Sequence, residues 1–195
     1  MVKLAEGKSV VVPTGIEQDF KITPAQLEAA ITPKTRAIIL CSPSNPTGSI
    51  YSKEELKALA DVLAKHQDIT IIADEIYEHI NYVGKHESIA QFENIRDRVV
   101  IVNGVSKAYA MTGWRLGWIA APQWIASACN KLQGQYSSGP SSIAQKAAEA
   151  AYNGDQACVE EMRKGFHRRR DLIVSLASDI EGFRVNVPHG AFYLF

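Results

Sequence analysis

The sequence predicts an α/β protein with a mostly parallel sheet flanked by helices. Three short apolar runs, rich in Ile and Val, occupy residues 37–41, 69–73 and 99–102. They are continuous rather than alternating, which is typical of strands buried on both faces of a parallel sheet. A helical pattern separates the first two runs. Strand, helix and strand in this order predict a right-handed βαβ unit.

Two helices in the first half of the chain have readable starts. Thr23 is followed by a proline at the first helical position and by Gln26, which completes a capping box. Ser52 and Glu55 form a second capping box. An apolar stripe at helical spacing follows it across residues 56–63, so we expect this helix to pack on the sheet.

The second half of the chain is mostly helical by its pattern. Helices are predicted from about residue 122 to 132, from 141 or 142 to 151, and from 155 to 177. Further strands are expected at residues 9–12, at Val185 and Val187, and at residues 191–195. The last run ends the chain without visible partner strands, and the start is equally abrupt. We therefore expect a fragment of a longer protein.

Composition and charge exclude several classes of function. The chain has 195 residues, with 21 Lys+Arg against 21 Asp+Glu, so it has no net charge with which to hold a nucleic-acid backbone. No apolar run approaches the ~18 residues needed to cross a bilayer, and the first residues lack the apolar stretch that is typical of a signal peptide. Three well-separated cysteines argue against a disulfide framework or a metal site and indicate a cytoplasmic protein.

Polar side chains follow all three predicted strands. Asn45 lies in the loop after the first run, Asp74 and Tyr77 follow the second, and Lys107 and Arg115 follow the third. Ligands of open α/β sheets bind beyond the carboxyl ends of the strands. The sequence therefore predicts a site at this edge.

Each of these residues also has an ordinary structural interpretation. Asn45 could belong to a turn, Asp74 could cap one, Lys107 could extend to solvent, and Arg115 could form an ion pair. Together they indicate one chemistry. A desolvated lysine forms Schiff bases, a carboxylate holds a pyridinium nitrogen protonated, an arginine clamps phosphate, and a phenol or amide binds a phenolic oxygen. Pyridoxal 5′-phosphate (PLP) needs this set of groups.

Three ordered motifs carry a family resemblance that runs through essentially the whole chain. They are SPSNPTG at residues 42–48, ADEIY at 73–77 and SKAYAMTGWRLG at 106–117. The chain resembles the class I/II aminotransferases of PLP fold type I, most closely the bacterial-type aspartate aminotransferases. The resemblance implies a partial PLP-binding large domain at 1–153, a connecting helix at 154–180, and the start of a smaller α+β domain at 181–195.

The resemblance also implies roles for three catalytic residues. Lys107 matches the lysine that forms the Schiff base with the cofactor and moves the proton between the substrate Cα and C4′. Asp74 matches the carboxylate that pairs with the pyridine nitrogen. Tyr77 matches the phenol that hydrogen-bonds to the cofactor O3′.

Further positions match groups that hold the cofactor or the substrate. Asn45 matches the amide that contacts O3′ and the substrate carboxylate, and the bond between Asn45 and the next residue, a proline, matches one that is cis in the family. Arg115 matches the phosphate clamp, helped by Ser106. Gly104 stands where some relatives carry a phosphate-binding serine. The strand at residues 115–121 is expected to be antiparallel to its neighbours.

The implied activity is transfer of an amino group between an amino acid and a 2-oxo acid, with substrates of the aspartate and 2-oxoglutarate type. The alternatives are a PLP-dependent lyase or synthase of the same fold, and a non-catalytic PLP-binding regulatory module. The family is usually homodimeric. Its ring-stacking residue, its glycine/serine-rich phosphate turn and its carboxylate-binding arginine have no counterpart here, so we expect the chain alone to be inactive.

Overall fold

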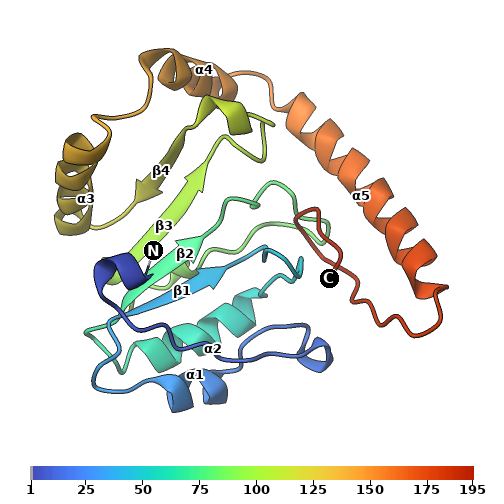
Figure 1. Ribbon diagram of the computed structural model, residues 1–195, viewed down its shortest axis with the longest axis horizontal. Coiled ribbons are helices and arrows are strands. Elements are labelled where there is room, and N and C mark those ends of the chain that lie inside the picture. Colours follow the sequence, from blue (N-terminus) through green and yellow to red (C-terminus); the bar gives the residue numbers. More distant parts are fainter. Residues whose placement is uncertain (1) are drawn as a thin grey trace.

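The structure is a computed structural model that describes residues 2–195 (Figure 1). A four-stranded sheet with strand order β1-β2-β3-β4 forms its centre. The strands are β1 (Ala37–Cys41), β2 (Thr70–Asp74), β3 (Val99–Gly104) and β4 (Gly117–Ala120). β1, β2 and β3 run parallel, and β4 is antiparallel to β3. The three predicted parallel strands and the antiparallel fourth strand are confirmed.

The register brings the ends of the parallel strands to one edge. Cys41 pairs with Asp74 across β1 and β2, and Asp74 pairs with Val102 across β2 and β3. The loops that leave β1, β2 and β3 therefore start side by side, because parallel strands present their carboxyl ends at the same edge.

Helices α1 (Pro24–Ala30) and α2 (Lys53–Leu63) lie together on one side of the sheet (Figure 1). Both predicted capping boxes form: Thr23 and Gln26 bond reciprocally at the start of α1, and Ser52 and Glu55 do so at the start of α2. The apolar stripe of α2 packs into the main core with residues of α1 and the sheet. That core includes Leu27, Leu59, Leu63, Ile71 and Ile95.

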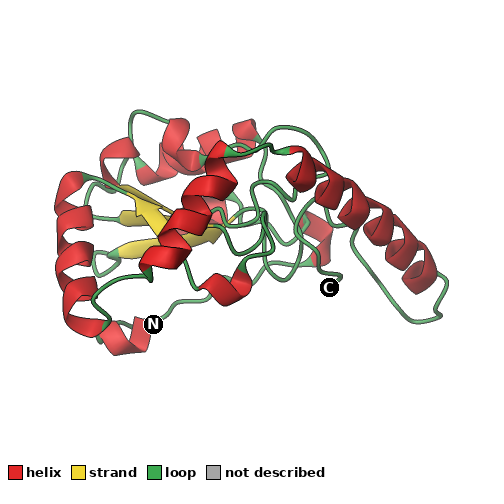
Figure 2. Cartoon of the chain, turned by 90° about the horizontal axis from the view of Figure 1, so that it is seen from above, coloured by secondary structure: helices red, strands yellow, loops and turns green. Residues whose placement is uncertain are grey.

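The second half of the chain adds α3 (Gln123–Tyr136), α4 (Ser142–Asn153) and α5 (Ala157–Ser178). Figure 2 shows the strands between layers of helix, with α5 reaching away from the sheet. Short 3-10 helices lie at Val2–Ala5, Ile16–Gln18, Ile89–Gln91, Arg96–Arg98 and Thr112–Trp114. Among residues 2–195, no helix combines the length and apolar character needed to cross a bilayer.

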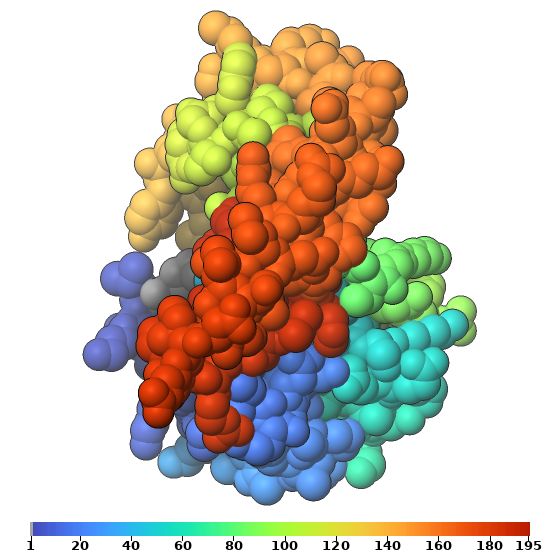
Figure 3. Space-filling model, turned by 90° about the vertical axis from the view of Figure 1, so that its right-hand side faces the viewer, coloured from blue at the N-terminus to red at the C-terminus, as the bar shows by residue number. Residues whose placement is uncertain are grey.

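After α5 the chain turns back and returns to the sheet edge. In Figure 3, α5 and the C-terminal residues, in orange and red, lie over the blue atoms of the first part of the chain. The returning segment makes one isolated antiparallel bridge, between Asn81 and Gly190. Backbone hydrogen bonds from Ala191 N to Ile80 O and from Tyr82 N to His189 O, each 2.8 Å long, continue this contact.

The predictions of strands at residues 9–12, at Val185 and Val187, and at residues 191–195 are wrong. Residues 9–12 are irregular, and Val10 and Val11 are largely exposed, because no neighbouring strand in the described part of the chain pairs with them. Val185 and Val187 also lie outside any strand. Residues 191–195 form no strand either, because Ala191 adopts a left-handed conformation with φ of 55° that turns the chain.

Candidate active site

The candidate site lies at the carboxyl edge of β1, β2 and β3. The loop after β1 carries Asn45, the turn after β2 carries Tyr77, and the loop after β3 carries Lys107. The Ser42–Pro43 and Asn45–Pro46 peptide bonds are both cis, and the second was expected. The C-terminal segment reaches the same place, since His189 N and Gly190 N both donate to Gly48 O at 2.9 Å.

Tyr77 forms the buried centre of this site. The residue is only 2% exposed, and its ring packs edge-on against Phe192 and Tyr193, with centroid distances of 5.4 and 5.8 Å. Its hydroxyl lies 2.6 Å from the Tyr193 hydroxyl. The Asn45 side-chain amide donates to both phenols, at 3.4 Å to Tyr77 and 3.2 Å to Tyr193. Three polar groups from distant parts of the chain thus meet in one triangle.

Lys107 points its ammonium group at the same aromatic rings. Its Nζ lies 5.7 Å from the centroid of Tyr77 and 5.8 Å from that of Phe192. A cation at this distance from an aromatic face is stabilised by the ring quadrupole. The structure therefore brings three of the predicted site residues, Lys107, Tyr77 and Asn45, together.

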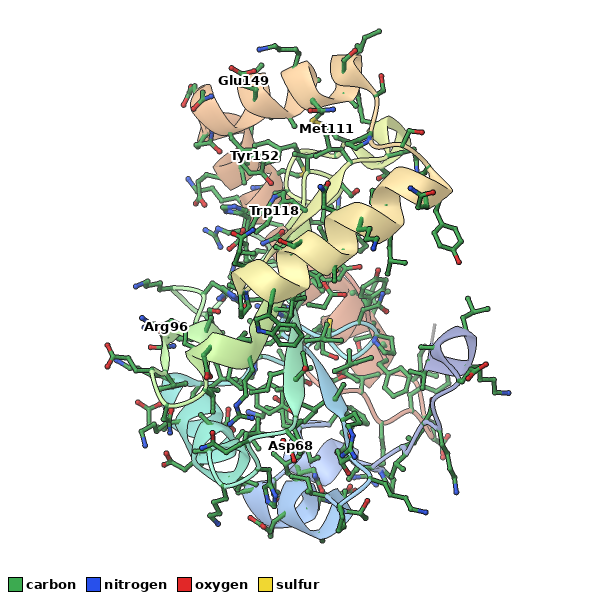
Figure 4. The ribbon with its side chains drawn as sticks, turned by 90° about the vertical axis from the view of Figure 1, so that its left-hand side faces the viewer. Asp68, Arg96, Met111, Trp118, Glu149 and Tyr152 are labelled. Carbon is green, nitrogen blue, oxygen red and sulfur yellow. The ribbon has the colours of Figure 1, made fainter. Side chains whose placement is uncertain are left out.

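The loop that carries Lys107 is held against the following helices. The Tyr109 ring packs edge-on against Tyr152 of α4 at 5.3 Å, and its hydroxyl donates to Gln156 Oε1 at 2.8 Å. Figure 4 shows Trp118 of β4 and Tyr152 in the same part of the molecule, where the indole N–H donates to the Tyr152 hydroxyl at 2.8 Å. These contacts hold the loop that carries Lys107 against α4, and α4 against β4.

Asp74 ends β2 beside these groups. Its Oδ1 accepts the backbone N–H of Ile76 at 3.2 Å, so it caps the turn that leads to Tyr77. Its pairing partner across the sheet is Cys41, whose pKa is raised to about 11 by burial and, less strongly, by the Asp74 carboxylate. The Cys41 thiol therefore stays protonated at neutral pH.

Ser106 and Arg115 lie in one loop, at its two ends. Thr112 bridges them, since its hydroxyl donates to Ser106 O at 3.3 Å and its carbonyl accepts Arg115 Nη1 at 2.9 Å. Arg115 is exposed and left-handed, with φ of 54°. Within residues 2–195, neither side chain has a hydrogen bond or ion pair to Asn45, Tyr77 or Lys107, so the structure does not join these two predicted residues to the aromatic cluster.

Comparison with known proteins supplies the family. The sequence model described as "Aminotransferase class I and II" matches residues 1–195. The chain belongs to the class I and II aminotransferases. It is 50% identical over 200 residues to the bifunctional aspartate aminotransferase and glutamate/aspartate-prephenate aminotransferase of Petunia hybrida, covering all of this chain and 42% of that protein. It is 52% identical over 197 residues to the aspartate aminotransferase of Geobacillus stearothermophilus, covering 100% and 50%.

A solved structure agrees with this assignment. The crystal structure of the aspartate aminotransferase from Rhizobium meliloti superposes with a TM-score of 0.96 at 44% identity, over 99% of this chain and 49% of that one. The aminotransferase chain thus spans about half the length of the curated relatives it matches. Its α/β architecture, a mostly parallel sheet flanked by helices, is the one it shares with these aminotransferases.

Phe192 and Tyr193 are site residues that sequence reasoning missed. The apolar run at residues 191–195, with its three aromatic residues, has the pattern of a strand, although in this aminotransferase chain Phe192 and Tyr193 line the candidate site. The docking of this segment is visible only in the structure, where Gly48 has φ of +68° and a Cβ added there would lie 2.3 Å from Pro188 Cβ. Such a close approach shows that the segment before Phe192 docks on the loop that carries Asn45.

A second polar cluster lies behind the Tyr77 turn. The buried Glu75 accepts Ser88 Oγ at 2.6 Å and lies 2.9 Å from His86 Nε2, while Glu78 accepts the Asn103 amide at 2.8 Å. Glu75, Glu78 and His86 place possible metal ligands within 4.8 Å of one another. Because neighbouring side chains already bond the carboxylates, we interpret the cluster as a support for the turn. A cavity of about 570 Å³ adjoins it beneath α5.

Proposed function

We propose that this chain forms the cofactor-binding part of a PLP-dependent aminotransferase that moves an amino group between an amino acid and a 2-oxo acid. The convergence of the Lys107 ammonium, the Tyr77 phenol and the Asn45 amide at the carboxyl edge of the sheet carries this proposal. The family match over the whole chain supports it.

The donor set fits the chemical groups of PLP. A phenol and an amide that bond one another, as Tyr77 and Asn45 do, suit the phenolic oxygen of the pyridine ring. An amine over the same aromatic ring, Lys107, suits the aldehyde beside that oxygen. The Asp74 carboxylate, at the end of the adjacent strand, suits the ring nitrogen. When bound, PLP supplies an electron sink for the bonds of the substrate Cα.

The residues of this chain then have distinct tasks. Lys107 would hold the cofactor through its aldehyde, and its Nζ would be the group that removes the substrate Cα proton. Asp74 keeps the ring nitrogen protonated, and Tyr77 holds the phenolic oxygen by donating its proton to it.

Ser106 and Arg115 are proposed to hold the phosphate group. The guanidinium donates to the Thr112 carbonyl, so this role requires it to turn from its own loop toward the anion. A guanidinium binds phosphate through two parallel, charge-assisted hydrogen bonds, which are stronger than the one bond to the neutral Thr112 carbonyl that would be lost.

Aspartate and 2-oxoglutarate are the proposed substrates. The printed names of the Petunia and Geobacillus relatives state aspartate aminotransferase activity, and that activity favours transamination over a lyase or a regulatory module. Asn45 is proposed to bond the substrate carboxylate as well as the cofactor, since its amide lies at the exposed mouth of the site.

The organisation of the whole protein is also a proposal. We assign residues 1–153 to the large domain, 154–180 to a connecting helix and 181–195 to the start of a smaller domain. The whole enzyme is proposed to be cytoplasmic and a homodimer. Sedimentation analysis of the full-length protein tests the homodimer directly.

The deciding experiment adds PLP to the full-length protein, follows its visible absorbance, reduces with borohydride and maps the modified lysine. We expect label on Lys107, and conversion of aspartate and 2-oxoglutarate to oxaloacetate and glutamate. Lys107→Ala should abolish both, while Lys131→Ala on the exposed face of α3 should change neither. Label spread over surface lysines, or aspartate turnover that survives Lys107→Ala, would refute the proposal.

A further inference from the structure

We propose that Tyr193 is a positioning residue for the Tyr77 phenol, and that it keeps the Tyr77 hydroxyl aimed at the cofactor's phenolic oxygen. This inference rests on the proposed function, because Tyr193 acts on the cofactor only through Tyr77. The two hydroxyl oxygens are 2.6 Å apart and come from residues separated by 116 positions.

The triangle of Asn45, Tyr77 and Tyr193 leaves one phenolic proton for a ligand. The Asn45 amide donates to both phenols, so it consumes neither hydroxyl proton. The two phenols carry two protons, and the bond between them uses only one. When an acceptor in the site takes the Tyr77 proton, the Tyr193 hydroxyl can turn and donate to Tyr77 Oη. A phenol that accepts such a bond is a stronger donor, because hydrogen bonds in a chain polarise one another.

The segment that carries Tyr193 is anchored on both sides of the site. Gly190 N bonds Gly48 O in the Asn45 loop, and Ala191 N bonds Ile80 O in the turn after β2. The neighbouring Phe192 ring stacks on Phe166 of α5 at 5.2 Å. These backbone and ring contacts hold the segment in place, and they therefore fix the position of the Tyr193 hydroxyl.

The surroundings of Tyr77 make its proton sensitive to this contact. Burial raises the pKa of Tyr77, and the bond to Tyr193 raises it further when Tyr77 is the donor. When a ligand takes the Tyr77 proton, Tyr193 becomes the donor and the same contact makes Tyr77 the stronger donor. The titratable groups that face Tyr77 are Tyr193, the Cys41 thiol of β1 and the Lys107 ammonium. Of these, the Tyr193 hydroxyl alone contacts the Tyr77 hydroxyl among the described residues.

The test measures the pH at which the visible absorbance of PLP changes in the full-length protein. Donation from Tyr77 to the phenolic oxygen stabilises the deprotonated form of the bound cofactor, so weakening it raises this apparent pKa. We expect Tyr77→Phe to raise it, and Tyr193→Phe to raise it by about 0.4 to 1 pH unit, the equivalent of one hydrogen bond. In the Tyr77→Phe background, Tyr193→Phe should have no further effect.

Tyr82→Phe is the matched control. The Tyr82 hydroxyl donates to the carbonyl of Ala191, so this variant loses a bond to the same segment without touching the Tyr77 hydroxyl. It should leave the apparent pKa unchanged. A Tyr82→Phe shift as large as that of Tyr193→Phe would overturn the proposal, because the segment and not the hydroxyl would then be responsible.

Two further outcomes separate the possible failures. If wild-type protein binds PLP on Lys107 and Tyr77→Phe shifts the pKa while Tyr193→Phe does not, the role of Tyr193 is refuted and the proposed function stands. If wild-type protein shows no PLP absorbance, the proposed function itself fails.

A second variant covers the case in which Tyr193→Phe fails to fold. 3-Fluorotyrosine at position 193 keeps the side chain and makes its hydroxyl a stronger donor, so it should lower the apparent pKa. An unchanged or raised value would contradict the proposal.

Discussion

Asn103 at the end of β3 donates from its side-chain amide to Glu78 Oε1 at 2.8 Å. The bond joins the turn that carries Tyr77 to the end of β3, from which the loop that carries Lys107 starts. Asn103 is buried, and its Oδ1 also accepts the backbone N–H of Gly104 at 2.7 Å. One side chain thus holds two of the loops that form the candidate site.

Replacing this amide should destabilise the protein. Asn103→Ala leaves the Gly104 N–H buried without a partner and removes a donor from Glu78, and we expect a loss of about 1 to 3 kcal/mol in the free energy of unfolding. Urea titration measures the loss. Asn130→Ala, an exposed position on α3, serves as the control. Equal stability of the Asn103→Ala and Asn130→Ala proteins would contradict the bridging role.

Gly48→Ala should loosen the docking of the C-terminal segment. Gly48 has φ of +68°, and an added Cβ would lie 2.3 Å from Pro188 Cβ and 2.7 Å from Gly190 O. Such overpacking costs about 1 to 3 kcal/mol. Gly134→Ala in α3 has no atom within 4 Å of the added Cβ and should instead stabilise the helix slightly. Thermal unfolding compares the two, and a Gly48→Ala protein as stable as Gly134→Ala would refute the close approach.

Asp74→Asn should impair the chemistry of the whole enzyme and leave the turn intact. The amide oxygen can still accept the Ile76 N–H, whereas a neutral group cannot hold a pyridinium nitrogen protonated. We expect kcat with aspartate to fall by at least about 100-fold. Asp68→Asn is the control, because Asp68 is exposed and precedes β2, away from the carboxyl edge (Figure 4). Steady-state kinetics that give equal kcat values for the two variants would contradict the assignment.

His79 and Glu78 should make stability depend on pH. The bond to Glu78 raises the pKa of His79 above its usual value, against the effect of burial. A raised folded-state pKa stabilises the protein fully below the unfolded value of about 6.5 and loses that stabilisation as pH rises through the folded value. Burial opposes the charge on Glu78, but His79 and Asn103 hold its pKa below the usual range, so the pair persists at moderately acidic pH.

We therefore expect His79→Gln to lower the melting temperature at pH 6 and to have little effect at pH 9. The His79 side chain is 42% exposed, so solvent screening keeps the contribution below about 1 kcal/mol. High salt should reduce the difference further. A His79→Gln effect that is the same at pH 6 and pH 9 would show that the ion pair contributes nothing.

Local signals explain what the sequence predicted well. The capping boxes at Thr23 and Ser52 involve groups three residues apart, and the apolar runs mark β1, β2 and β3 as strands by their local pattern. The burial on both faces that the runs predicted is wrong for β1, because β1 lies at the edge of the described sheet and its Ile39 is 55% exposed. The parallel topology of these strands also predicted that the polar residues that follow them lie at one edge of the sheet. Residues 191–195 were misjudged because an apolar run looks the same whether it pairs in a sheet or lines a site.

By itself the sequence determined the α/β class, the parallel strands, the family and the set of candidate residues, because each depends on local pattern or motif. Only the tertiary structure decided that Tyr193 meets Tyr77 and that Arg115 bonds its own loop. Those contacts depend on the path of the chain after α5 and on the turn at Thr112. A hydrogen bond across 116 residues leaves no periodicity in the sequence, since it is set by the packing of whole elements.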